Sequence, residues 1–239
     1  MSTRLNFYNS LINKYLEKNS KILVVGSGLN DLNLFKNSGF TNFTMSSFSS
    51  FEKDGTTFKK IDINKIDEKN DSYDYVVAHA CIHHCSKPHS GILEMYRVAR
   101  KGVLIIEARD SLLMKVMVKL NVAEKYEISA VTHQDEYGDY GGVDNTEIPN
   151  YVYRWTENEV EKLISSFNPK YNHVISYNYE FEFENILKKI NNKFLKSVIS
   201  FFLKVNLKML KFAFKKQSNL FSFFINKELS KKNKHSWIN

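Results

Sequence analysis

A short, purely apolar segment followed at once by a glycine turn constrains the fold of this chain more than any other feature. All residues of Ile22–Val25 are apolar, which is typical of a strand buried on both faces, and Gly26-Ser27-Gly28 follows without a spacer. Residues 31–36 then read as a helix. A strand, a tight glycine turn and a helix start in this order bring backbone N–H groups close to a ligand, because a Cβ would fill the gap. A strand-to-helix turn without a ligand is the alternative that this motif alone leaves open.

Strand and helix patterns alternate along the first half of the chain. Further apolar strands are expected at residues 42–45, 58–61, 73–80 and 103–107, and an amphipathic helix at 90–100. Strands without an apolar–polar alternation are typical of a parallel sheet that helices cover on both faces. We therefore predict an α/β fold with a doubly wound, mostly parallel sheet, preceded by an N-terminal helix within residues 1–20.

The net charge of +8 is unevenly distributed. Residues 188–239 contain 13 lysines and one acidic residue, whereas the rest of the chain is mildly acidic and holds all nine glycines. Lysine far outnumbers arginine, so the basic balance gives weak support for nucleic-acid binding, and we expect no such partner. With 14% aromatic residues and two cysteines, the composition excludes a disordered chain and a disulfide-stapled one. The first 18 residues lack an uninterrupted apolar run of signal-peptide length, and we expect a cytoplasmic protein.

A longer motif extends the glycine turn. Asp62 follows the third expected strand, and the run from Asp74 to His84 precedes Pro88, a helix and the strand that ends at Glu107. In this order, and with the stretch EMYRVARKG, residues 21–110 resemble the class I S-adenosylmethionine-dependent methyltransferases, closest to the branch often called methyltransferase type 11. The resemblance implies a seven-stranded Rossmann-like sheet, S-adenosyl-L-methionine as the cofactor and methyl transfer as the reaction.

The resemblance also implies which residues hold the cofactor. In that family the glycine turn passes under the methionine part, an acid after the third strand approaches the adenine amino group, and the end of the fourth strand faces the transferred methyl group. The matching residues of this chain are Gly26, Ser27, Gly28, Asp62, Ile63, Ala78 and His79.

One position departs from the family pattern in a way that bears on affinity. The acid that ends the second strand and binds both ribose hydroxyls is replaced by Ser46 or Ser47. A carboxylate that accepts two hydroxyl hydrogen bonds contributes about 1.5–3 kcal/mol, and a serine recovers only part of this. Asp31, on the glycine-turn side, is the alternative ribose ligand. A methyltransferase-like binding or scaffold protein that has lost cofactor use is the competing function.

Four of the seven histidines and both cysteines lie between residues 79 and 89. An oxygen or nitrogen nucleophile needs a base, and histidine is suited to this near neutral pH. We expect His79 to be that base, with His83 or His84 next and His133 as an outside candidate. Capping or structural roles for these histidines are the alternative. We expect no metal, because CxxC spacing is absent and the resemblance already accounts for the paired histidines.

The segment after the fifth strand supplies candidate substrate-binding residues. Arg109 and Asp110 leave that strand at the ligand-binding edge of the sheet. Aromatic residues and glycines then gather in 116–155, which we interpret as a lid over the substrate, although ordinary surface packing is the alternative. The candidate aromatic contacts are Tyr137, Tyr140, Tyr151 and Tyr153.

The C-terminal part is expected to complete the sheet. Strands are expected at 173–183 and 219–226, within a region 156–227 that also contains a basic helical insertion at about 185–217, and residues 228–239 form a basic tail. The insertion has one lysine stripe and a wide apolar face. Its central lysines disfavour a membrane span, so it either packs on the core or lies in a membrane interface, such as the inner face of the cell membrane.

These observations favour a methyltransferase with a cofactor-binding core at residues 21–115 that acts on an oxygen, less favourably a nitrogen, of a small molecule. A sugar of a polysaccharide or of a lipid-linked precursor is the acceptor class that the aromatic lid and the basic insertion suggest.

Overall fold

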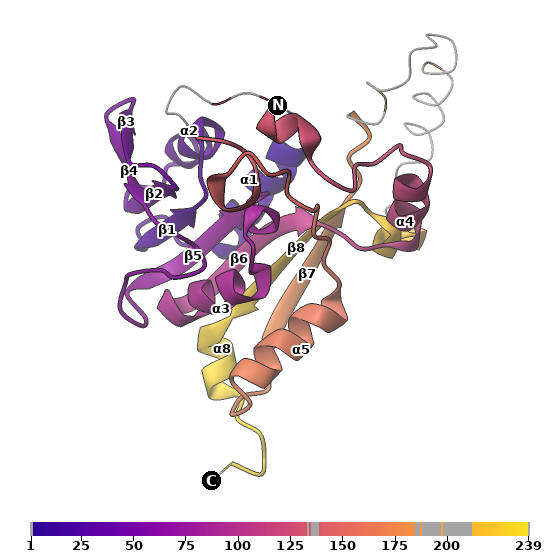
Figure 1. The fold of residues 1–239 in the computed structure, drawn as a ribbon. Coiled ribbons are helices and arrows are strands. Elements are labelled where there is room, and N and C mark those ends of the chain that lie inside the picture. Colours follow the sequence, from indigo (N-terminus) through magenta and orange to yellow (C-terminus); the bar gives the residue numbers. More distant parts are fainter. Residues whose placement is uncertain are drawn as a thin grey trace.

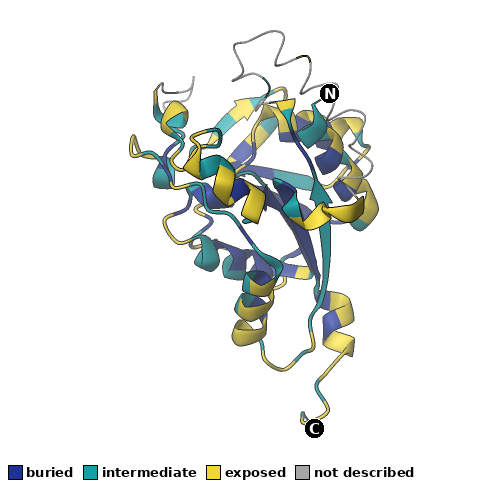
Figure 2. Ribbon diagram, turned by 90° about the vertical axis from the view of Figure 1, so that its right-hand side faces the viewer, coloured by how far each residue is buried: buried dark blue, intermediate teal, exposed yellow. Residues whose placement is uncertain are grey.

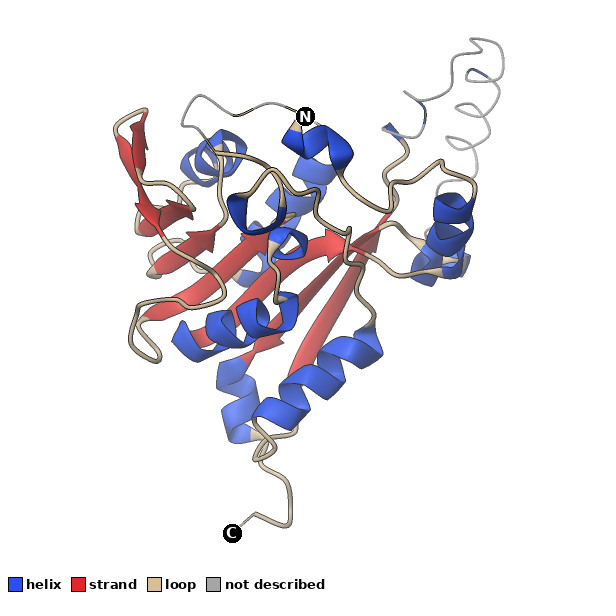
Figure 3. Cartoon of the chain, in the orientation of Figure 1, coloured by secondary structure: helices blue, strands red, loops and turns tan. Residues whose placement is uncertain are grey.

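The computed structural model describes residues 2–132, 134, 139–184, 187, 197 and 212–238. Its centre is a single sheet, whose strands are β1 (Ile22–Val25), β2 (Phe43–Ser47), β3 (Phe51–Lys53), β4 (Thr56–Lys60), β5 (Tyr73–His79), β6 (Ala99–Ala108), β7 (Val174–Glu180) and β8 (Leu220–Asn226). The described helices are α1 (Thr3–Tyr15), α2 (Leu29–Asn37), α3 (Pro88–Val98), α4 (Leu112–Lys119), α5 (Glu157–Phe167) and α8 (Lys227–Lys232). Figures 1 and 3 show helices on both sides of the sheet.

The strand order is β3-β4-β2-β1-β5-β6-β8-β7. The five strands from β4 to β6 are parallel, whereas β8 runs antiparallel between β6 and β7. The predicted α/β fold with a mostly parallel sheet is therefore confirmed. The sheet has eight strands rather than the expected seven, because β3 pairs antiparallel with β4 and adds an edge strand. The chain reverses between these two strands at Asp54 and Gly55, which both have positive φ.

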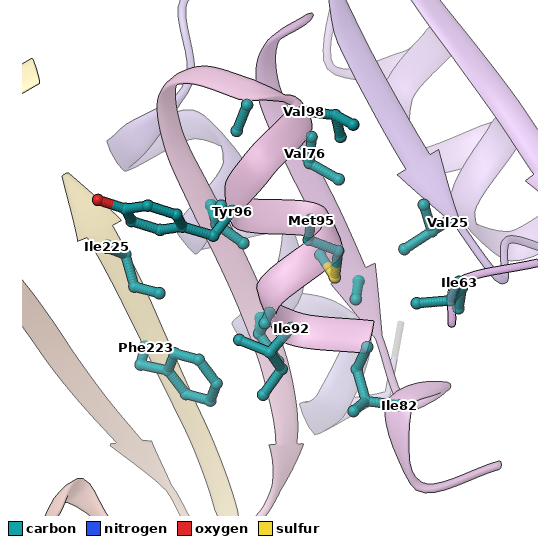
Figure 4. Close-up of a cluster of buried hydrophobic side chains, with 14 of the residues drawn as sticks. Val25, Ile63, Val76, Ile82, Ile92, Met95, Tyr96, Val98, Phe223 and Ile225 are labelled. Carbon is teal, nitrogen blue, oxygen red and sulfur yellow. The ribbon is translucent and has the colours of Figure 1, made fainter. Parts of the chain in front are cut away.

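Two apolar layers cover the two faces of the sheet, as the burial colours of Figure 2 show. Alternate residues of the central strands point to opposite faces: Leu23 and Val25 belong to one layer, and Ile22 and Val24 to the other. Helices α3 and α5 complete the first layer, and α1 and α2 complete the second. In Figure 4, Ile92 and Met95 of α3 lie over Val76 of β5. Burial on both faces explains why these strands show no apolar–polar alternation in the sequence.

Local signals set the ends of the helices that frame the site. Helix α2 begins directly after the glycine turn, where the N–H of Gly28 donates to Oδ2 of Asp31 at 2.9 Å. Helix α5 begins at Thr156, whose hydroxyl accepts from the N–H of Glu159 at 3.3 Å. This agrees with the cap that Thr156 and the following glutamates indicate. Helix α4 overlaps the segment 116–155, expected to be a lid, only in its second half.

The helical insertion expected at 185–217 falls almost entirely outside the described residues, and so does Tyr137 of the expected lid. Residues 227–232, expected in part as a basic tail, form α8, which packs beside β6. In the part of the chain that the structure describes, no helix has the length and apolar character needed to cross a membrane.

Candidate active site

A cavity of about 520 Å³ lies where the carboxyl ends of the parallel strands meet the described residues of the segment 128–145, which are 128–132, 134 and 139–145. This segment, which we call the cap, includes two short 3₁₀ turns at Ile128–Val131 and Val143–Asn145. From the sheet side the cavity is lined by Gly26, Ser47, Phe48, Ile61, Ile63, Ala80, Cys81 and His84. From the cap it is lined by Ala130, Gln134, Asp139, Tyr140, Gly141, Gly142 and Asn145. This edge of a doubly wound sheet is where such folds bind ligands.

The first glycine of the turn is required by the backbone and by its neighbours. Gly26 has φ +55°, and a Cβ on it would lie 2.6 Å from Cβ and 2.8 Å from Sγ of Cys81. Gly28 differs, because its backbone is extended and a Cβ there would meet only Oδ2 of Asp31, at 3.9 Å. The fold therefore needs glycine at position 26 but leaves open space at position 28. That space is what a ligand approaching the turn would use.

The two serines that end β2 have different roles. Ser46 is fully buried, and its hydroxyl donates to the carbonyl of Val24 at 3.1 Å. Its backbone N–H donates to the Ser27 hydroxyl at 3.0 Å, and the Ser27 N–H donates to the Ser46 carbonyl at 2.8 Å. Ser27 and Ser46 thus connect the ends of β1 and β2. Ser47 is the serine that lines the cavity.

Asp31 and His79 lie behind the glycine turn rather than on the cavity wall. Oδ1 of Asp31 is 3.5 Å from Nδ1 of His79, and the imidazole stacks on the ring of Tyr8 with centroids 4.4 Å apart. Nε2 of His79 is buried and has no hydrogen-bond partner among the described residues. Neither side chain is among those that line the cavity. The geometry therefore favours a packing role for His79 and a capping role for Asp31.

The residues after β4 and at the end of β5 form the adjoining wall. Ile63 is buried and lines the cavity, while Asp62 beside it is exposed and accepts from the Asn64 N–H at 2.8 Å. Ala78 is fully buried within β5. Ala80, two residues further, lines the cavity and has φ +50°, a strained conformation for a residue with a Cβ. Such strain persists where the surrounding structure enforces it, as it does at many ligand sites.

The paired histidines of the 3₁₀ turn Ile82–His84 form a polar cluster with two glutamates that the sequence analysis did not include. Nδ1 of His83 lies 2.6 Å from Oε2 of Glu107, a carboxylate with no exposed surface. Nδ1 of His84 lies 2.7 Å from the carbonyl oxygen of Gly141 in the cap. Glu127, just before the cap, places Oε2 3.4 Å from Nε2 of His83 and 3.5 Å from Nε2 of His84. Of the four histidines expected as candidates for the base, His133 lies outside the described residues, and of the other three His84 is the one that lines the cavity.

The charges in the cluster favour a protonated His83 and an ionised Glu127. Burial opposes a charge on His83, but Glu107 and Glu127 outweigh it and raise the pKa of His83 to about 10. A hydrogen bond from His83 and its charge lower the pKa of Glu127 to about 2. Burial and the neighbouring His83 charge lower the pKa of His84, so that imidazole is neutral at pH 7. The cluster thus holds two carboxylates and one neutral imidazole beside the cavity.

The two cysteines of the same run are packing residues. Both are free and buried, and burial raises the pKa of each thiol, that of Cys85 to about 12. The Cys81 thiol donates to the carbonyl of Val25 at 3.3 Å. They are therefore protonated thiols near neutral pH and are poor metal ligands or nucleophiles.

The residues expected to bind substrate are separated by the fold. Arg109 is 5% exposed, and its guanidinium binds both carboxylate oxygens of Glu157, at 2.7 and 2.8 Å. Tyr140 lines the main cavity. Asp110, Tyr151 and Tyr153 line a second cavity of about 410 Å³ beside α4. Arg109 therefore connects β6 to α5, and the other three lie away from the wall formed by the glycine turn.

Four contacts anchor the cap to the sheet side of the cavity. The Ser49 hydroxyl donates to Oδ1 of Asp139 at 2.5 Å, and the Ser86 N–H donates to Oδ1 of Asp144 at 2.9 Å. That oxygen also accepts from Asn64 at 3.2 Å, and the His84–Gly141 contact is the fourth. These hydrogen bonds hold the cap over the cavity through Asp139, Gly141 and Asp144.

A family comparison identifies the domain. Residues 41–106, which run from β2 through most of β6, match the family described as a methyltransferase domain. Over these residues the chain is similar to a methyltransferase domain. No curated protein matches the chain.

The fold of the chain is similar to that of solved methyltransferase structures. A methyltransferase of Archaeoglobus fulgidus that depends on S-adenosylmethionine has 12% identity and a TM-score of 0.54, over 93% of this chain and 94% of that one. The 1,6-didemethyltoxoflavin-N1-methyltransferase of Burkholderia thailandensis, solved with 1,6-didemethyltoxoflavin and S-adenosylhomocysteine, has 10% identity and a TM-score of 0.51, over 94% and 78%. A Haemonchus contortus phosphoethanolamine N-methyltransferase has 14% identity and a TM-score of 0.50, over 92% and 52%. These likenesses show the Rossmann-like fold of the class I S-adenosylmethionine-dependent methyltransferases, as expected from the sequence.

Two functional candidates escaped the sequence analysis for different reasons. Glu107 gave a signal, since a carboxylate that ends an otherwise apolar, fully buried strand must find a partner. Glu127 gave none, because it lies in an irregular segment and meets the histidines only through the tertiary structure.

Proposed function

We propose that this protein transfers the methyl group of S-adenosylmethionine to an oxygen, less favourably a nitrogen, of a small molecule held in the main cavity. The observation that carries the proposal is the cavity itself, which has the glycine turn on one wall, His84 on another and the cap above it. The bound cofactor supplies an electrophilic methyl group on a sulfonium. The protein contributes by positioning the two reactants and excluding water, which accounts for most of the catalysis in an in-line displacement.

The lining residues, together with Gly28 and Asp62 next to them in the sequence, suggest how the cofactor is divided along the cavity. The open space at Gly28 suits the methionine part near the N-terminus of α2, where backbone N–H groups favour a carboxylate. Ser47 suits the ribose, and the apolar side chains of Phe48, Ile61 and Ile63 suit the adenine ring. Asp62 follows β4 beside this apolar wall, in the position of the family's adenine-binding acid.

His84 supports an acceptor whose proton must be removed. Its imidazole is neutral and reaches the cavity, and its Nδ1–H is engaged by the Gly141 carbonyl, so Nε2 carries the free lone pair. We therefore place the reacting oxygen or nitrogen at the His84 end of the cavity, in preference to His79. Tyr140 in the cap suits a ring-shaped acceptor, and a sugar hydroxyl remains the acceptor class we propose.

The discriminating experiment is calorimetry with S-adenosylhomocysteine. We expect binding, and we expect Gly28→Val to weaken it by at least about tenfold. The variant should still fold, because a Cβ at this position meets no atom nearer than 3.9 Å. Thr57→Val, on an exposed position of β4, is the matched control. Absence of binding at millimolar ligand would instead favour a scaffold protein that has lost cofactor use.

A peripheral membrane contact through residues 185–217 is a separate proposal, and it rests on the lysine stripe and apolar face in the sequence. Co-sedimentation with vesicles that contain anionic lipid tests it. Deletion of this segment should abolish the binding, and unchanged binding would end the proposal.

A further inference from the structure

The cluster at the His84 end of the cavity has the geometry of a metal site. The side chains of His83, His84 and Glu127 each offer one ligand atom, and these atoms all lie within 4.8 Å of one another. The same oxygen, Oε2 of Glu127, is 3.4 Å from one Nε2 and 3.5 Å from the other. Hydrogen bonds between such groups are shorter, at about 2.7–3.2 Å. Bonds of about 2.0–2.1 Å around a tetrahedral zinc ion place neighbouring ligand atoms about 3.3–3.5 Å apart, which is the spacing of the two histidine–glutamate pairs.

Both imidazoles are oriented for coordination. A carbonyl oxygen and a carboxylate oxygen can only accept, so Nδ1 of His84 donates to Gly141 and Nδ1 of His83 donates to Glu107. Each Nε2 therefore faces Glu127, and a bound ion would displace the proton that the two glutamates favour on Nε2 of His83. Metal-binding histidines nearly always donate their other ring N–H to a carboxylate or a carbonyl in this way, and both kinds of partner are present.

The charges in the cluster also suit a divalent cation. Glu107 and Glu127 carry two negative charges, and the described part of the chain places no lysine or arginine in an ion pair with either of them. Asn150, which is 1% exposed, donates to Oε2 of Glu127 at 3.2 Å and holds that carboxylate in place. Once a bound ion has displaced the His83 proton, two neutral imidazoles and two carboxylates would balance one doubly charged ion.

We propose that His83, His84 and Glu127 bind a divalent transition-metal ion of the zinc class. Two imidazole nitrogens and one carboxylate oxygen are the ligands that such ions accept, and three protein ligands leave a fourth position for water or a ligand oxygen. The site borders the cavity through His84 and connects the strand ends to the residue just before the cap. The ion would therefore fix the cap and present its open position to the acceptor.

The role of the ion in catalysis rests on the proposed function. With the ion bound, His84 would be a ligand and the ion would take over its role in activating the acceptor. An acceptor hydroxyl at the fourth position would lose its proton more readily, and that proton would pass to solvent. The resulting oxygen forms a bond to the methyl carbon as the sulfur–carbon bond breaks, and the sulfur keeps the electron pair. The metal site itself requires no methyl transfer and is tested without it.

Zinc titration of the chelator-treated full chain, followed with a competing chromophoric chelator, tests the site. We expect one tightly bound equivalent, and His84→Ala and Glu127→Gln should each weaken zinc binding by at least about tenfold. His89→Ala is the matched control, because His89 pairs with Glu159 at 3.0 Å and no third ligand joins them. Unchanged zinc affinity in both site variants, or no zinc bound by the wild type, would overturn the proposal.

The hydrogen bond by which Glu107 orients the His83 imidazole allows a second test. Glu107→Gln should weaken zinc binding by about 10–100-fold, as the loss of an outer carboxylate does elsewhere. Circular dichroism checks that this variant folds. Zinc binding without S-adenosylhomocysteine binding would contradict only the proposed function, and the reverse result would contradict only the metal site.

Discussion

Ser47 is the residue whose side chain we expect to limit cofactor affinity most directly. It occupies the end of β2 on the cavity wall, where the family places the acid that binds both ribose hydroxyls, while its neighbour Ser46 is buried and bonded to the Val24 carbonyl. The sequence left the two serines as equal candidates. The direction of each side chain from the sheet distinguishes them.

Ser47→Asp should therefore tighten S-adenosylhomocysteine binding. A carboxylate that accepts two hydroxyl hydrogen bonds adds about 1.5 kcal/mol or more, which corresponds to about tenfold in the dissociation constant. Calorimetry measures the change. Ser46→Asp is the control and should lower stability instead, because it buries an unpaired charge. If Ser47→Asp binds S-adenosylhomocysteine no more tightly than the wild type, the ribose does not bind at Ser47.

Arg109 illustrates a residue whose chemistry suggested a substrate contact but whose position indicates a structural one. Its guanidinium is held between Glu157 and the rings of Tyr179 and Phe221. Arg109→Ala should lower the free energy of unfolding by about 3–5 kcal/mol, because it leaves a partly buried carboxylate without its partner. Urea denaturation measures this. Lys115→Ala removes an exposed pair with Asp110 and should cost less than about 1 kcal/mol. Unchanged stability together with a raised KM would instead indicate that Arg109 binds the substrate.

At the scale of elements, one carboxylate joins three strands at the edge opposite the cavity. Asp74 of β5 accepts from the backbone N–H of Lys21, just before β1, and from Arg100 of β6. Burial opposes its charge, but the hydrogen bonds from Arg100 and Lys21 outweigh this and lower its pKa. The order of the parallel strands thus places these groups together, although they are far apart in the sequence.

The lowered pKa of Asp74 predicts an acid-dependent loss of stability. A carboxyl group with a depressed folded-state pKa stabilises the fold above its unfolded value of about 3.9, and that contribution is lost as pH falls through the folded pKa. The free energy of unfolding should therefore fall below about pH 4, and Asp74→Asn should show a smaller fall over the same range. Urea denaturation between pH 3 and 6 measures both, with pH 6 as the reference. Equal pH dependence in the two proteins would contradict this assignment.

At the scale of the whole molecule, the cavity forms only where the sheet and the cap meet. The sheet side contributes the glycine turn and the strand ends, and the cap contributes Tyr140, Gly141 and Asn145. A bound ligand should therefore contact both the sheet side and the cap, and so stabilise the contacts between them.

A saturating cofactor should raise the unfolding temperature. At a ligand concentration about 100 times the dissociation constant the gain is about 2.7 kcal/mol, which corresponds to about 5–10 °C for a chain of this size. Differential scanning calorimetry with S-adenosylhomocysteine measures it. Tyr140→Ala removes cap contact area and should reduce the shift, whereas Tyr171→Ala, which lies outside the cavity, should leave it unchanged. Equal shifts in the unfolding temperature of the two variants would indicate that the cap does not contribute to cofactor binding.

The sequence by itself determined the fold class and the position of the site along the chain. The reason is local: apolar runs such as Ile22–Val25 record burial on both faces, and Gly26 records a backbone conformation that other residues rarely adopt. Only the tertiary structure decided which of the adjacent candidates face the cavity. It turned Ser47 and His84 toward the cavity, placed Ser46 and His79 in the packing, and brought Glu107 and Glu127 to the paired histidines. These contacts join residues more than 20 positions apart, and no local pattern encodes them, because they depend on how the strands and the cap are arranged in space.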